Sequence, residues 1–180
     1  RFGRKKLGFV FLCVLILFLY REPRELEITF LDVGQGDGIH IAVEEKHFFI
    51  DGGSVDVRGL GEYRILPYLK YNGISEIQYW FITHADTDHI SGVLEVIETG
   101  YPICNLVLPK AIPKDANYEK LIRAAQSHHI NICYMKTGDR IACEGAYFRC
   151  IYPGDRELSD RNEASLVLEL NWEEKKALFT

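Results

Sequence analysis

Two histidines and two aspartates lie within one six-residue stretch of this chain: His84, Asp86, Asp88 and His89. They directly follow the apolar segment 77–82, which has the composition of a buried strand. Carboxylate and imidazole groups at the end of a buried strand need partners, and a divalent cation partners several of them at once. A polar turn that caps the next helix would explain one of these side chains but not both histidines. We therefore predict a metal site with these four residues as ligands.

The stretch 84–89 resembles the HxHxDH signature of the metallo-β-lactamase superfamily, with Asp86 at the position of the second histidine. The upstream sequence DVGQGD, residues 32–37, resembles a motif of one branch of that superfamily, the ComEC-type competence proteins. Those proteins carry DNA across the bacterial inner membrane. The two motifs together are specific for this branch. Further similar stretches are 49–53, 63–70 and 162–167, so the resemblance extends from about Ile28 to the last residue.

The resemblance implies a role for each of the four predicted ligands. In the superfamily the first two signature positions bind one metal and the Asp-His pair binds a second. His84 and Asp86 would thus belong to one site, and Asp88 and His89 to the other. Asp88 is the predicted catalytic residue, which orients or deprotonates the attacking water. A carboxylate in place of an imidazole hardens the site, so we expect one or two divalent ions, manganese or zinc, with manganese or magnesium favoured over zinc.

Five further residues are predicted at the rim of the site or behind the ligands. By resemblance, Asp51 orients a ligand histidine through a hydrogen bond. Asp32 and Asp37 lie in the loop that the family places at the site, although Asp37 between two glycines could equally form an Asx turn. Asn162 and Ser165 fall where a superfamily enzyme usually supplies a third histidine, and could offer an oxygen ligand or a substrate contact.

The remaining histidines are not expected to bind metal. His128 and His129 are adjacent near the end of a polar helix, where side chains of neighbouring residues point ~100° apart. We expect His40 and His47 on solvated strand and turn surfaces. Each of these four is thus assigned to the protein surface rather than to the site.

Residues 7–20 are fourteen residues without a charge, between the basic cluster 1–6 and a second charged stretch at 21–24. They predict a membrane helix with a basic flank over 1–24, the last membrane helix of a larger protein. A secretory signal peptide is the alternative, but no small-residue cleavage site follows. Since the basic cluster precedes the helix, the positive-inside rule places everything after it on the extracytoplasmic face of the cell membrane.

The rest of the chain, 25–180, alternates between strand and helix patterns. Its fold class is α/β (α+β), and the resemblance implies an αββα metallo-β-lactamase sandwich, incomplete at its C-terminus. The expected helices are 60–71, 90–99 and 117–129. The expected strands are 26–31, 39–44, 48–51, 77–82, 105–108, 130–135, 140–143, 147–152, 166–171 and 177–179.

Charge divides sharply along the chain and bears on function. Residues 1–24 hold six Arg or Lys and one Glu, which leaves fifteen basic and twenty-five acidic residues in 25–180, a net charge of −10. A domain with this much negative charge binds a phosphate backbone poorly without a cation.

Three functions remain open on the sequence alone. The leading hypothesis is a metal-dependent phosphodiesterase of a membrane DNA-uptake protein, degrading the DNA strand that is not imported. Its substrate would be single-stranded DNA, and its partners the membrane channel of the same protein and other competence proteins. The alternatives are a non-hydrolytic domain that shapes the DNA path, and a membrane-anchored hydrolase of small esters.

Overall fold

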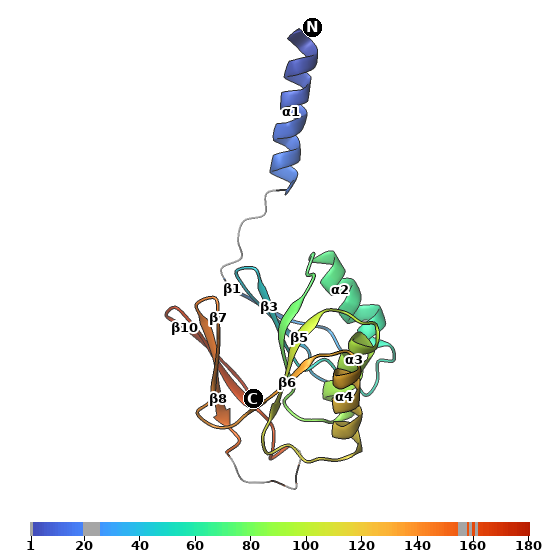
Figure 1. The fold of residues 1–180 in the computed structure, drawn as a ribbon, viewed down its shortest axis with the longest axis vertical. Helices are drawn as coiled ribbons and strands as arrows, with labels where there is room; N and C mark the ends of the chain where they lie inside the picture. Colours follow the sequence, from blue (N-terminus) through green and yellow to red (C-terminus); the bar gives the residue numbers. More distant parts are fainter. Residues whose placement is uncertain (1, 20–25, 155–157, 159, 161) are drawn as a thin grey trace.

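The computed structural model describes residues 2–19, 26–154, 158, 160 and 162–180 (Figure 1). An N-terminal helix is followed by strands and helices that pack into layers. In chain order the elements are α1 (Phe2–Leu19), β1 (Leu26–Phe30), β2 (Ile39–Val43), β3 (Lys46–Ile50), the π-helical turn η1 (Gly61–Ile65), α2 (Leu66–Tyr71), β4 (Ile77–Phe81), α3 (Thr87–Glu98), β5 (Ile103–Pro109), α4 (Ala116–Ser127), β6 (Asn131–Met135), β7 (Arg140–Cys143), β8 (Ala146–Tyr152), β9 (Val167–Trp172) and β10 (Lys175–Phe179).

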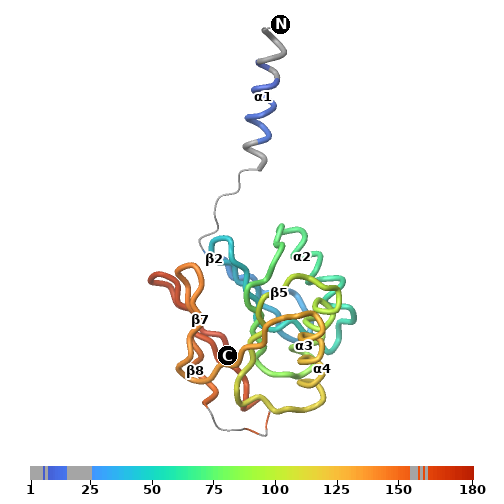
Figure 2. The backbone as a smooth tube through the Cα atoms, in the orientation of Figure 1, coloured from blue at the N-terminus to red at the C-terminus, as the bar shows by residue number. Residues whose placement is uncertain are grey.

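Two sheets form the centre of the domain. The larger has six strands in the order β1-β2-β3-β4-β5-β6, and the smaller has four in the order β10-β9-β8-β7. The first two pairings of the larger sheet are antiparallel hairpin contacts, and β3 to β6 then run parallel through helical crossovers. Figure 2 follows the chain from the first sheet into the second, which is antiparallel throughout.

The six-stranded sheet is covered on both faces. Helices α2, α3 and α4 lie on one face and the four-stranded sheet on the other (Figure 1). Phe49 and Trp80 belong to the core under the helices, whereas Phe48 and Phe81 point the other way, against Phe148 of the second sheet. Burial on both faces explains why these strands are apolar without alternation. The helix, sheet and sheet layers match the predicted metallo-β-lactamase sandwich.

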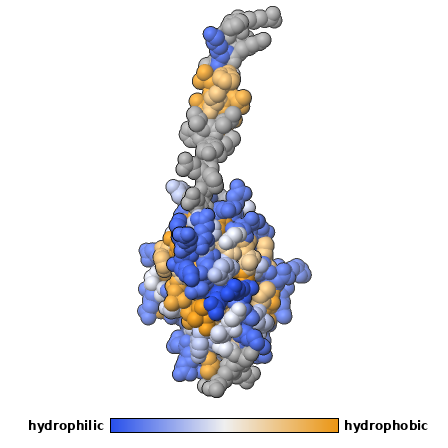
Figure 3. Space-filling view, turned by 90° about the vertical axis from the view of Figure 1, so that its left-hand side faces the viewer, coloured by the Kyte–Doolittle hydropathy of each residue, from blue (hydrophilic) through white to orange (hydrophobic). Residues whose placement is uncertain are grey.

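Helix α1 stands apart from the two sheets in Figure 1. It begins with the basic residues Arg4, Lys5 and Lys6 and continues as an apolar stretch, whose exposed side chains form the orange band of Figure 3. Among the residues that the structure describes, no helix combines the length and the apolar character that crossing a membrane requires. The predicted membrane helix is therefore not supported over residues 2–19, and residues 1 and 20–24 of that prediction lie outside the described residues.

Most predicted elements are present, with boundaries shifted by one to three residues. The shift that matters is at α3, which begins at Thr87 instead of Ile90 because Asp86 is already its N-cap residue, with extended backbone angles. Asp88 and His89 are thus in the first helical turn and not in a loop before it.

The prediction that His40 lies on a solvated surface is wrong. Its side chain is fully buried, because helix α2 covers this face of β2. The two ring nitrogens lie 2.8 Å from the Tyr68 hydroxyl and 3.1 Å from Nδ1 of His47. The sequence pattern of this strand does not distinguish a solvent-facing histidine from a buried, hydrogen-bonded one, and His40 is the buried kind.

Candidate metal centre

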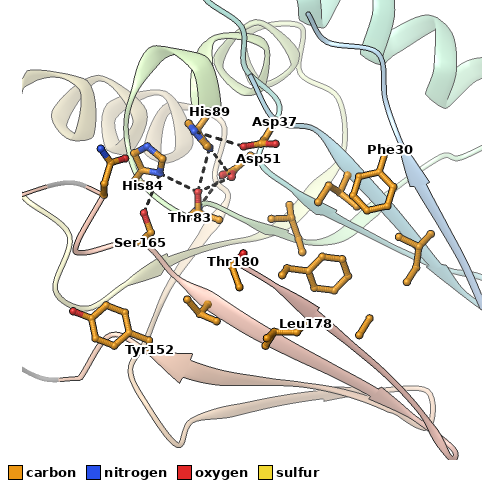
Figure 4. A pocket seen from close by; sticks show the side chains of 17 residues that line it. Phe30, Asp37, Asp51, Thr83, His84, His89, Tyr152, Ser165, Leu178 and Thr180 are labelled. Carbon is orange, nitrogen blue, oxygen red and sulfur yellow. Dashed lines mark hydrogen bonds and ion pairs between the residues drawn. The ribbon is translucent and has the colours of Figure 1, made fainter. Parts of the chain in front are cut away.

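The predicted ligands gather at the carboxyl ends of two neighbouring parallel strands. Strands β3 and β4 pair in parallel, and the backbone N–H of Asp51, just after β3, donates to the carbonyl of Phe81 at 2.9 Å. The two strands therefore end at the same edge of the sheet, with Asp51 beside Thr83. Helix α3 starts immediately beyond and supplies His89 to the same point (Figure 4).

Asp51 is the centre of the hydrogen-bond network. It is buried, and Thr83 donates to it twice: the backbone N–H to Oδ1 at 2.8 Å and the hydroxyl to Oδ2 at 2.6 Å. Nδ1 of His89 lies 2.8 Å from the same Oδ2. The Asp51 backbone has a φ of +52°, a left-handed conformation that Asp tolerates better than most residues. The carboxylate faces Thr83, which follows β4.

The network fixes the orientation of both histidines. A His89 that donates its Nδ1–H to Asp51 leaves the lone pair of Nε2 facing away from the core. The Thr83 hydroxyl gives its proton to Asp51, so its oxygen can accept from Nδ1–H of His84, 3.1 Å away. Ser165 Oγ lies 3.3 Å from the same nitrogen. Asp51 and Thr83 together therefore hold both rings with Nε2 free for a ligand.

Three of the four predicted ligands form one group. Ligand atoms of His84, Asp88 and His89 all lie within 4.8 Å of one another, and the two imidazole rings are 3.8 Å apart between centroids. The carboxylate of Asp86 lies 3.6 Å from Nε2 of His84 and is not part of this group. The structure thus combines one histidine from each predicted site with Asp88, and places Asp86 next to His84.

The rim residues separate into two kinds. Oδ2 of Asp37 and Oδ2 of Asp88 each lie 3.8 Å from Nε2 of His89, so two carboxylates face this nitrogen. Asp37 therefore belongs to the site. The side chain of Asp32 is 92% exposed, and its carboxylate pairs with Arg64 at 3.3 Å, outside the group of ligands.

The two histidines differ in their electrostatic environment. Burial, followed by the nearby His89, lowers the pKa of His84. Burial alone would also lower the pKa of His89, but the hydrogen bond to Asp51 and the charges of Asp51, Asp88 and Asp37 more than offset it, so the pKa of His89 is raised. A proton therefore binds His89 before His84, and competes with a cation mainly there.

A cleft of about 800 Å³ opens between the two sheets in front of the histidines (Figure 4). Its walls are largely apolar side chains of β1, β2, β9 and β10, and among the described residues that line it there is no Lys or Arg. Asn162 and Ser165 line it together with the two histidines. Both predicted rim residues therefore face the site, although the contact that the structure gives to a histidine there is that of Ser165.

Close backbone packing holds the site loops together. A Cβ atom on Gly36 would come within 2.2 Å of the Gly53 carbonyl oxygen and 2.5 Å of that of Asp88. A Cβ on Gly53 would meet the backbone of Asp88 and His89 at 2.4 Å. Only glycine permits this approach. These glycines and Thr83 were not predicted as site residues, although the glycines within the recognised motifs were a signal that could have found them.

The residues present fit a divalent cation. Two imidazoles with Nε2 turned outward and a carboxylate, all with ligand atoms within 4.8 Å of one another, make up a set of nitrogen and oxygen donors that first-row transition metals bind. Asp51 and Thr83 supply the hydrogen bonds from behind that ligand histidines need. The fit rests on this donor chemistry and on the fixed orientation of the rings.

Comparisons with known proteins agree with this geometry. Residues 31–103 match the model of the metallo-beta-lactamase superfamily. Among solved structures, a metallo-β-lactamase of Cronobacter sakazakii with a HARLDQ motif superposes with a TM-score of 0.56 and 14% identity, over 92% of this chain and 65% of that one. The diiron β-hydroxylase CmlA of Streptomyces venezuelae gives 0.52 and 18%, over 88% and 30%. The domain therefore has the metallo-β-lactamase fold, with a His/Asp group that could hold a metal ion at the carboxyl ends of β3 and β4.

One curated protein gives a more specific similarity than the family model does. The chain is 28% identical over 173 residues to ComE operon protein 3 of Bacillus subtilis (strain 168), covering 87% of this chain and 22% of that protein. The predicted resemblance to ComEC-type competence proteins and their metallo-β-lactamase-like domain is thus confirmed. The fold and the partial family match are also those expected of a metallo-β-lactamase-type hydrolase.

Proposed function

We propose that this chain is the metal-dependent phosphodiesterase domain of a membrane DNA-uptake protein, and that it degrades the DNA strand that is not imported. The observation that carries the proposal is the group formed by His84, Asp88 and His89 at the mouth of an open cleft. The similarity to a competence operon protein supports DNA as the substrate. Other competence-machinery proteins and the membrane channel of the same protein are the proposed partners.

The chemistry needs a cation, for which we propose manganese rather than zinc, in one or two copies. When bound, such a cation polarises a phosphate ester and makes water a better nucleophile at neutral pH. The oxygen-rich surroundings favour manganese, because Asp37, Asp86 and Asp88 lie beside only two imidazoles. With so acidic a domain, the cation also offsets the repulsion between protein and phosphate.

Asp88 is the proposed catalytic residue. Its carboxylate belongs to the ligand group and its side chain is 34% exposed, so it is accessible to solvent water. In hydrolysis the water oxygen bonds to phosphorus while the ester P–O bond breaks, and the water proton passes to the Asp88 carboxylate. The leaving oxygen takes a proton from solvent. His84 and His89 would hold the cation, and Ser165 offers a hydroxyl at the cleft wall.

Cleavage assays with Asp88→Asn test this proposal. The 180-residue chain, loaded with manganese, should cut a labelled single-stranded oligonucleotide and the small diester bis(4-nitrophenyl) phosphate. Asp88→Asn should lose at least about 100-fold in rate on both, since it removes the group that takes the proton. Asp139→Asn is the control, because Asp139 is a partly exposed aspartate outside the ligand group, whose carboxylate accepts the Lys136 backbone N–H at 2.9 Å.

A non-hydrolytic role in shaping the DNA path is the second candidate, favoured by the net charge of −10 and the cleft without a described basic residue. Failure of the wild-type chain to hydrolyse either substrate with manganese, magnesium or zinc would establish this alternative over the enzyme. Metal analysis that finds no bound ion after manganese is added would also contradict the proposal.

We further propose that the domain lies on the extracytoplasmic face of the cell membrane. This proposal rests on the sequence pattern: the basic cluster in residues 1–6 precedes the uncharged segment 7–20, and basic residues that flank a membrane segment tend to remain in the cytoplasm. A cysteine introduced at the exposed Arg58 should react with a membrane-impermeant maleimide in intact cells. Protection of that site until the membrane is permeabilised would invert the assignment.

A further inference from the structure

The loop that carries Asp37, residues 31–38, is held at two points before it reaches the site. The first point is Asp32, whose carboxylate and backbone carbonyl both contact Arg64 of η1. The second is Gln35, which lies against the loop that follows β3, residues 51–57. Between and beyond these points the loop contains Gly34, Gly36 and Gly38, which leave its backbone free to adopt many conformations unless something fixes it.

A set of polar contacts around Ser54 and Asp56 fixes Gln35; we call it the Ser54–Asp56 clamp. Oδ1 of Asp56 accepts from the Gln35 backbone N–H at 2.8 Å and from the Ser54 hydroxyl at 2.7 Å. The N–H of Val55 donates to the Gln35 carbonyl at 3.0 Å. The Ser54 N–H donates to Ser91 Oγ at 2.9 Å, and that hydroxyl lies 3.1 Å from the Ser54 carbonyl.

The clamp joins three segments that are distant in sequence. Ser91 is in α3, two residues after His89, so the contacts tie the loop 31–38 and the loop 51–57 to the helix that supplies the ligands. On the other side of the loop, the Asp37 N–H donates to the Asp88 carbonyl at 3.2 Å. The Gly53 N–H donates to the Asp37 carbonyl at 3.1 Å.

We infer that Asp56 is a positioning residue that holds the Asp37 carboxylate beside His89. The inference rests on the proposed metal-dependent function, and it assigns a task to a residue that is no part of the ligand group. The physical reason is that a carboxylate accepting a backbone N–H makes a stronger bond than a neutral acceptor does. Asp37 has a side chain that is 62% exposed, so its position depends on its backbone and not on packing.

Ionisation of Asp56 agrees with this role. The Ser54 hydroxyl, followed by the Gln35 N–H, holds the pKa of Asp56 below its usual range. The carboxylate is therefore charged at neutral pH, where the clamp has to act. Asp56 is exposed, so its removal is not expected to unfold the domain, and the variants remain available for measurement.

The first experiment measures loop order without any metal. In Asp56→Ala of the 180-residue chain, NMR hydrogen exchange at the Asp37 amide should accelerate about tenfold, because the bond to the Asp88 carbonyl opens more often. Asp56→Asn, which keeps an oxygen acceptor, should show a smaller change. Asp139→Ala should leave the Asp37 amide unchanged. Equal exchange in wild type and Asp56→Ala overturns the inference.

The second experiment is a double-mutant cycle on manganese affinity by isothermal titration calorimetry. Asp56→Ala should raise the dissociation constant about tenfold, the usual effect of losing a residue that supports a ligand. In an Asp37→Ala background the same substitution should change nothing further, since Asp56 acts through Asp37. Additive losses, or an Asp37→Ala chain that binds manganese as well as wild type, contradict the inference. A wild-type chain that binds no manganese defeats the proposed function, while the exchange experiment still decides on the clamp.

Discussion

Replacing Asp51 by Asn should weaken metal binding without removing a single ligand. The substitution keeps the shape of the side chain, but an amide nitrogen replaces an oxygen opposite Nδ1 of His89, which lies 2.8 Å from Oδ2. If that nitrogen donates a hydrogen, His89 must accept it on Nδ1 and carry its own proton on Nε2. The nitrogen that should face the cation is then blocked.

The size of the effect follows from the contacts that are lost. Asp51 accepts two hydrogen bonds from Thr83 and one from His89, and hydrogen bonds to charged groups contribute about 1.5–3 kcal/mol each. Asn can retain the bond from the Thr83 N–H, so we expect the free energy of unfolding of the apo domain to fall by about 2 kcal/mol. Metal affinity should fall about 10- to 100-fold, as for other residues that orient ligand histidines.

The pKa of His89 provides an independent measurement. Asp51 raises the pKa of this group against the effect of burial, so Asp51→Asn should lower it. In the wild type the folded pKa lies above the unfolded value of about 6.5. Protonated His89 therefore stabilises the folded apo chain below the unfolded pKa, and this stabilisation is lost as the pH rises through the folded pKa. The variant should lack this dependence.

Three measurements on the apo and manganese-loaded chain test this prediction for Asp51→Asn. Calorimetric titration gives the affinity, urea unfolding the stability, and a histidine-labelled NMR titration the pKa of His89. Asp139→Asn, outside the cleft, should behave as wild type in all of them. The reasoning fails if Asp51→Asn binds manganese with wild-type affinity while His89 titrates at its wild-type pKa. The Asp51 contact would then be a consequence of packing and not the feature that orients the ring.

Three further predictions concern the same domain. Bound manganese should be released as the pH falls from 7.5 to 5.5, since the raised pKa of His89 lets a proton displace the cation there, and electron paramagnetic resonance of free manganese measures it. Gly36→Ala should destabilise the domain by about 1–3 kcal/mol in urea unfolding, because its Cβ would lie 2.2 Å from the Gly53 oxygen. Unchanged stability would contradict the close packing. Asp115→Ala should cost about 1 kcal/mol, seen as a lower Tm, because Asp115 accepts from two backbone N–H groups at the start of α4.

The fold was largely predictable because its strands and turns have strong local patterns. Apolar runs of strand length separated by Gly and Asn turns gave every strand to within a few residues. The pairing of strands could not be read from those patterns, since the parallel order β3-β4-β5-β6 depends on crossovers whose hand and packing are properties of the whole domain. The resemblance to a known family gave the layers of the sandwich, and the order of the strands was not predicted.

The candidate site was predictable in its residue types but not in its connections. His84, Asp88 and His89 lie close in sequence, so their proximity follows from one loop and one helical turn. The role of Asp51 depends on the parallel contact of β3 with β4, and it was predicted only from the resemblance. His40 shows where local reasoning fails: an isolated polar residue on a strand has the same pattern whether it meets solvent or a buried tyrosine hydroxyl.

Charge explains why the metal centre and the acidic character of the domain belong together. With His84 neutral, because its pKa is lowered, the carboxylates of Asp37, Asp51 and Asp88 give the centre an excess of negative charge. A phosphate diester approaching this centre would be repelled, and no described Lys or Arg lines the cleft to attract it. A cation bound first reverses the sign of the potential at the point of attack. On the proposed function, binding of DNA should therefore follow binding of metal, and chelation should abolish both cutting and holding of the strand.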